Sequence, residues 1–107
     1  MKKNESFLLI KNHLINELSK TTSTAMEFVS LIEFIKKIKK DNSSLCEIYE
    51  TCSSIAIEYN KVASLIINIA NGNKTKSKSV TKLLLESLFS YEESMRAICV
   101  KINKTIS

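Results

Sequence analysis

The chain has 107 residues, a formal net charge of +5, no proline and a single glycine, and 44% of its residues are hydrophobic. This composition leaves little material for the tight turns of a β-meander or for a glycine-rich, phosphate-binding loop, so it favours an all-α fold. The length suits one domain, residues 1–107, which buries a core without disulfides or a metal. No apolar stretch reaches the roughly 20 residues of a membrane span or resembles a signal peptide, so we expect a cytoplasmic protein without a transmembrane segment.

The first predicted helix spans residues 5–40. Residues 20–24 within it are poor helix formers, and Thr24 with Glu27 fits a capping box that would start a separate helix. We favour one long helix, because the apolar stripe keeps its phase and no Gly, Pro, Asn or Asp marks a turn there. A four-helix up-down-up-down bundle is the alternative. The stripe consists of Leu14, Leu18, Thr21, Ala25, Phe28, Ile32 and Ile35.

The second predicted helix spans residues 44–71 and has the clearest pattern in the chain. Ser44 and Glu47 fit a capping box at its start. Gly72, the only residue that takes a positive φ at no cost, fits a C-cap at its end. Four consecutive heptads carry an apolar residue at both seam positions, the geometry by which helices pack lengthwise. These positions are Leu45, Ile48, Cys52, Ile55, Tyr59, Val62, Ile66 and Ile69.

The third predicted helix spans residues 77–105. A short loop between two long helices makes an antiparallel hairpin, so we expect an antiparallel bundle of three long helices. Its seam consists of Leu84, Leu88, Tyr91, Met95, Ile98 and Ile102.

Two groups of lysines lie near predicted helix ends. The first and last helices end at the same pole of such a bundle, so their lysines converge there as a candidate anion-binding site. Positive charge at a helix C-terminus also complements the macrodipole by about 0.3 kcal/mol per residue, which is the simpler explanation. This first group is Lys36, Lys37, Lys39, Lys40, Lys101 and Lys104. The second group, at a helix N-terminus where the dipole does not favour it, is Lys74, Lys76, Lys78 and Lys82.

Apolar residues wrap most of the way around the start of the last predicted helix. They exceed what one seam of a three-helix bundle buries, and an exposed apolar patch marks a partner or a dimer contact. A fourth helix would be the alternative cover. We therefore predict partner binding through Leu83, Leu85 and Phe89, and we note that Phe34 and Ile57 also fall off their stripes.

Catalytic and metal-binding patterns are missing from the sequence. His13 is the only histidine, and no His/Cys set has zinc spacing. The acidic residues follow helix-surface spacing, and neighbouring Glu92 and Glu93 point about 100° apart, which does not suit a paired acid and base. We expect no enzyme activity, no metal site and no cofactor. The three cysteines, Cys46, Cys52 and Cys99, are expected to be reduced, and only a cross-helix pair that includes Cys99 suits a disulfide.

These features predict a non-enzymatic helical protein–protein interaction module, such as a small adaptor, chaperone, immunity or inhibitor-type protein. Its partner would be another protein or a second copy of the chain, as a homodimer, bound through an apolar helix face. The alternative is an electrostatic, sequence-nonspecific nucleic-acid-binding protein that uses the clustered lysines. A sequence-specific reader is disfavoured because Arg96 is the sole arginine and the aromatic residues lie on or near apolar stripes.

Overall fold

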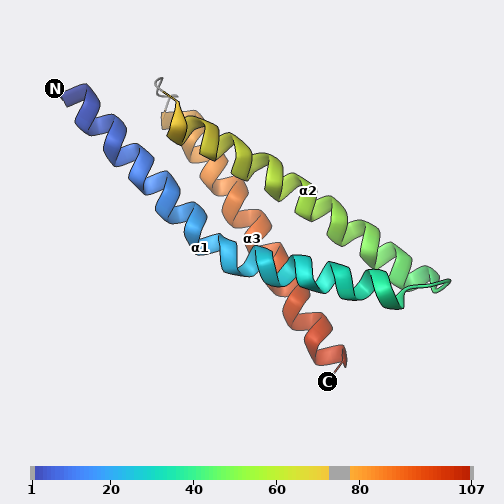
Figure 1. Ribbon diagram of the computed structural model, residues 1–107. Helices are drawn as coiled ribbons and strands as arrows, with labels where there is room; N and C mark the ends of the chain where they lie inside the picture. Colours follow the sequence, from blue (N-terminus) through green and yellow to red (C-terminus); the bar gives the residue numbers. More distant parts are fainter. Residues whose placement is uncertain (1, 73–77, 107) are drawn as a thin grey trace.

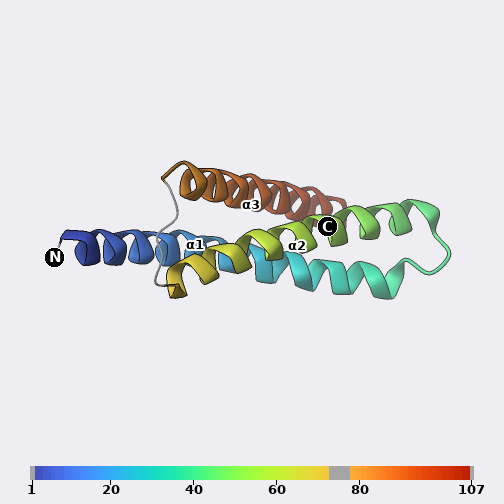
Figure 2. The same cartoon turned by 90° about the horizontal axis from the view of Figure 1, so that it is seen from above.

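The computed structural model describes the backbone of residues 2–72 and 78–106, and the side chains of residues 9–72 and 80–104. The chain folds into three long helices: α1 (Lys2–Ile38), α2 (Ser43–Asn71) and α3 (Lys78–Ile106). Each helix packs against both others, and α1 and α2 form an antiparallel hairpin beside which α3 runs in the direction of α1 (Figures 1 and 2). The bundle is elongated, with extents of 59 × 21 × 19 Å. The predicted all-α bundle of three helices is confirmed.

Helix α1 continues through residues 20–24, so the four-helix alternative is wrong. The hydroxyl-bearing residues there donate to carbonyl oxygens one turn back: Ser19 to Ile15 at 2.8 Å, and Thr22 to Leu18 at 3.1 Å. Such back-bonding satisfies the hydroxyl groups without ending a helix, and it often bends one. Figure 1 shows α1 changing direction in this light-blue stretch.

The start of α2 differs from the predicted capping box. The helix begins at Ser43, and Asn42 is its N-cap, with an extended backbone and a side-chain oxygen that accepts from the Leu45 N–H at 3.0 Å. Asn and Ser are comparable N-caps, so local sequence does not separate them. The turn from α1 determines which residue is the N-cap, because the Asn42 N–H donates to the Lys39 carbonyl at 2.7 Å and holds Asn42 at the helix start.

The end of α2 lies where the sequence predicts it, but the backbone is different. Gly72 is the C-cap, and its N–H donates to the Ile69 carbonyl at 3.3 Å. Its φ of −82° and ψ of 162° are extended, so the expected positive φ is wrong. The chain leaves α2 in an extended direction and does not use the freedom of glycine. Lys40, in the turn between α1 and α2, takes a φ of 38° instead.

The core follows the predicted seams over the middle of the bundle. The largest side chains with almost no exposed surface come from all three helices. The seams open toward the end that holds the α1–α2 turn, where Ile48 is 39% exposed although it occupies a seam position. The fully buried set is Leu14, Thr21, Phe28, Ile35, Cys52, Ile66, Leu88 and Met95.

Two polar contacts cross between helices beside this core. The Thr21 hydroxyl donates its hydrogen to the Leu18 carbonyl at 2.8 Å. Its oxygen therefore accepts from the Tyr59 hydroxyl across the α1–α2 contact, with 2.6 Å between the two oxygens. On the α1–α3 side, Thr24 donates to the Glu92 carboxylate at 2.9 Å, and Arg96 pairs with the same oxygen. Glu92 is only 8% exposed, so the expectation that all glutamates lie on the surface is wrong for this residue.

Candidate binding groove at one end of the bundle

An apolar groove opens where α3 diverges from the α1–α2 turn (Figure 1). It has a volume of about 460 Å³, within the range of small binding sites. All three helices contribute, and seven of the eleven lining residues are Ile, Leu or Phe. The lining comprises Phe34, Ile35 and Ile38 of α1, then Leu45, Glu47, Ile48, Thr51 and Cys52 of α2, and Ile98, Lys101 and Ile102 of α3.

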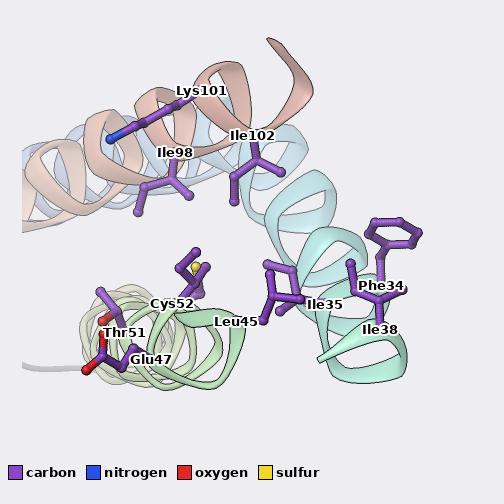
Figure 3. Close-up of a pocket in the computed structure, with 11 residues that line it drawn as sticks. Phe34, Ile35, Ile38, Leu45, Glu47, Thr51, Cys52, Ile98, Lys101 and Ile102 are labelled. Carbon is purple, nitrogen blue, oxygen red and sulfur yellow. The ribbon is translucent and has the colours of Figure 1, made fainter. Parts of the chain in front are cut away.

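The groove has a buried floor and a half-exposed edge. Ile35 and Cys52 are almost fully covered, and Ile98 and Ile102 extend from α3 toward α2 and α1 (Figure 3). Phe34 stands at the outer edge and is 43% exposed. The groove therefore combines seam residues such as Ile48, Ile98 and Ile102, which the sequence pattern assigns to the core, with the off-stripe Phe34.

Polar side chains gather along the opposite edge of the groove. Figure 3 shows Glu47 and Thr51 of α2 on that side, with Lys101 extending along α3 across from them. The apolar floor would take aliphatic or aromatic groups, and this edge offers an ammonium, a carboxylate and a hydroxyl for orienting contacts.

The six predicted anion-binding lysines lie on the segments that frame this groove. Lys36 and Lys37 are exposed in the last turn of α1, and Lys104 is exposed in the last turn of α3. Lys101 lines the groove itself. Lys40 is exposed in the turn, whereas the ammonium of Lys39 lies 5.3 Å from the centre of the Tyr49 ring in a cation–π contact. The first and last helices thus bring their lysines to one end of the bundle, as predicted.

The predicted partner-binding residues at the other end face different ways. Leu83 is 62% exposed and Phe89 is also exposed, whereas Leu85 is half-buried and packs against the core. Leu85 and Phe89 line a shallow groove of about 410 Å³ with Ile10 of α1. Part of the apolar surplus is therefore absorbed by contact with α1, and the role of Leu83, Leu85 and Phe89 in partner binding stays a prediction.

A third apolar surface runs along the α1–α2 contact. Its lining has no charged residue and no residue of α3, and exposed Met26, Val29 and Ile67 border half-buried Ala25 and Ala63.

The cysteines are free thiols: Cys52 and Cys99 are buried, and Cys46 is partly buried. Burial raises the pKa of the Cys52 thiol, and burial, then the negative charge of Glu27 and the neighbouring Cys52, raise the pKa of Cys99. Both therefore stay protonated at neutral pH and act as small apolar groups. The Cys46 thiol donates weakly to the Lys40 carbonyl at 3.7 Å.

His13 lies on α1, a helix without cysteines. Its ring nitrogen is 4.0 Å from the Glu17 carboxylate, and its side chain is largely exposed. No group of three His, Cys, Asp or Glu side chains suited to a metal occurs among the described residues. Within the same residues, no helix has the length and apolar character needed to cross a membrane.

One residue in the sequence pointed to the groove: Phe34 falls off the α1 stripe and lies close to Lys36 and Lys37 in sequence. The contributions of Ile48, Ile98 and Ile102 were not foreseen, because their seam positions predict burial. Comparisons with known proteins give no relative: no family model matches, and neither the curated proteins nor the solved structures contain a significant match.

Proposed function

We propose that this chain is a non-enzymatic protein–protein interaction module, an adaptor-, chaperone-, immunity- or inhibitor-type protein, that binds its partner in the end groove. The observation that supports it is the accessible seam: Ile48, Ile98 and Ile102 have core character, yet the divergence of α3 leaves them lining an open groove. The proposal keeps the cytoplasmic location expected from the sequence.

The energetics of apolar burial favour an occupant of this groove. Covering an exposed Phe, Leu or Ile side chain contributes about 1.5–3 kcal/mol, and Phe34 and Ile38 are each more than a third exposed. A helix that lays an apolar face into a groove is a common mode of protein recognition, and its anchors repeat every three to four residues. The groove offers contacts from three helices, which the flatter surfaces on this bundle do not.

The charged groups give less support to a base-reading nucleic-acid function. Arg96 is the sole arginine, and it pairs with Glu92 in the middle of the bundle. The end lysines suit phosphate contacts alone, which leave an apolar groove uncovered. A protein partner accounts for both the lysines and the groove.

Site-specific photo-crosslinking in the native host tests this proposal. A photoreactive phenylalanine analogue replaces Phe34 at the groove, Leu83 at the far end, or exposed Asn16 on α1 as the control position. We expect a discrete protein adduct from position 34 and none from position 16. An adduct from position 83 alone would move the partner to the Leu83 surface and overturn the groove assignment, and no adduct from either would overturn the interaction module.

A further inference from the structure

Several lysines around the end groove are not neutralised by a carboxylate in the described part of the chain. Elsewhere, Lys20 pairs with Glu17 at 2.9 Å and Lys61 with Glu58 at 3.2 Å, whereas Lys11 and Lys82 form no ion pair among the described residues. Among the described residues, Lys36, Lys37 and Lys104 form no ion pair. Their ammonium groups are exposed and open to carboxylates from outside the chain.

These unpaired lysines lie on both sides of the groove. Lys36 and Lys37 are adjacent in sequence to the groove residues Ile35 and Ile38 of α1. Lys104 follows Lys101 by one turn on α3. The carboxylates of Glu33, Asp41, Glu47 and Glu50 on these segments offset part of the charge, and the remaining excess sits at the ends of α1 and α3.

We propose that the occupant of this groove is an acidic amphipathic helix of a partner protein, with its apolar face in the groove and carboxylates toward these lysines. The inference rests on the proposed function and names the chemistry of the partner. Apolar residues spaced by three and four would reach Phe34, Ile48 and Ile102, and flanking Asp or Glu would pair with Lys36, Lys37 and Lys104.

Other candidate occupants are complementary to only part of the groove and its surrounding lysines. A second copy of the chain, itself at +5, would bring one basic end toward another. Nucleic acid would neutralise the lysines and leave Phe34 and Ile48 in water. An anionic bilayer would meet the exposed rim, but the floor at Ile35 and Cys52 is recessed and buried, out of reach of a flat surface.

Fluorescence anisotropy with the full chain tests the proposal directly. The probes are two labelled peptides of about 18 residues with the same Leu spacing, one with Glu and one with Lys on the polar face. We expect the Glu peptide to bind at least about tenfold more tightly than the Lys peptide. The charge reversal K36E/K37E/K104E should invert that preference, because it replaces three exposed cations beside the groove with carboxylates; circular dichroism checks that the variant is folded. Equal binding of the two peptides, or an unchanged preference in the triple variant, would overturn the inference.

Groove variants separate the apolar contribution from the charge. F34A should weaken binding of the Glu peptide about tenfold, whereas L83A, which also removes an exposed apolar side chain but at the far end, should leave it unchanged. Duplex DNA and vesicles of phosphatidylserine serve as the competing probes. If either binds more tightly than the Glu peptide and does so equally with F34A, the occupant is not an amphipathic helix. A position-34 crosslink without Glu-peptide binding would reject this inference and leave the proposed function standing.

Discussion

The middle of the bundle and its basic end use the same kinds of residues to different effect. In the middle, Phe28, Ile66 and Met95 meet from three helices and are almost fully covered. At the end, Ile48, Ile98 and Ile102 occupy equivalent seam positions, yet they line a groove. The apolar side chains are similar, so the difference comes from the path of the helices rather than from residue type.

The polar contacts in the two regions differ as well. In the middle, Thr21 bonds to Tyr59 and Thr24 to Glu92, so α1 is tied to α2 and to α3 at adjacent turns. At the basic end, the Asn42 side chain accepts from the Leu45 N–H within the α1–α2 turn and caps α2. Interhelix hydrogen bonds in the middle fix the register there.

Two phenylalanines of α1 give the largest expected contrast between the regions. F28A removes a fully buried ring and should lower the free energy of unfolding by about 3–5 kcal/mol, because it leaves a cavity in the core. F34A removes an exposed ring and should cost less than about 1 kcal/mol. Urea unfolding followed by circular dichroism measures both. Equal losses would mean that the groove is packed as tightly as the core.

The sequence predicts the middle of this molecule better than its end. A seam in strict alternation identifies Phe28, Ile66 and Met95 as core, and the unbroken phase of the α1 stripe identifies one helix where propensity alone suggested two. The threonines that lower that propensity are the same residues that bond to Tyr59 and Glu92. Tertiary contacts thus account for a stretch that looks unfavourable locally.

The end groove was beyond sequence reasoning because a heptad pattern carries no information on where helices separate. Ile48 and Ile102 satisfy the pattern as fully as Ile66 does. The choice of Asn42 over Ser44 as the N-cap likewise depends on the turn from Lys39, a contact that no local propensity contains. The convergence of lysines was foreseen, since it follows from helix count and direction alone.

Thiol reactivity provides a second, smaller contrast. Cys52 lines the groove but is buried, and burial raises the pKa of its thiol and of the Cys99 thiol. Both thiols should therefore react with a disulfide reagent at least about tenfold more slowly than that of partly buried Cys46. The rates should increase as the pH rises toward the raised pKa values, because the thiolate is the nucleophile. Mass spectrometry after timed labelling gives the order. Fast labelling of Cys52 would show that the groove extends deeper than its floor at Ile35.

Replacing the N-cap of α2 tests whether the polar contacts of the α1–α2 turn stabilise the basic end. N42A removes the side chain that accepts from the Leu45 N–H and should lower the free energy of unfolding by about 1 kcal/mol. S44A is the matched control at the position that the sequence pattern favoured, and it should change stability by less than about 0.5 kcal/mol. Thermal unfolding of the two variants distinguishes them, and a larger loss from S44A would restore the capping box.

The smallest effect is expected from the hydrogen bond that joins α1 and α2 in the middle of the bundle. Y59F removes the hydroxyl that donates to Thr21, but Thr21 still donates to the Leu18 carbonyl, so only an acceptor loses its partner and the cost should be about 0.5–1 kcal/mol. Y91F, at a half-buried position on α3, is the control and should lower the free energy of unfolding by less. If Y59F is as neutral as Y91F in urea unfolding, the middle of the bundle is held by apolar packing alone, and its polar contacts with α1 contribute register rather than stability.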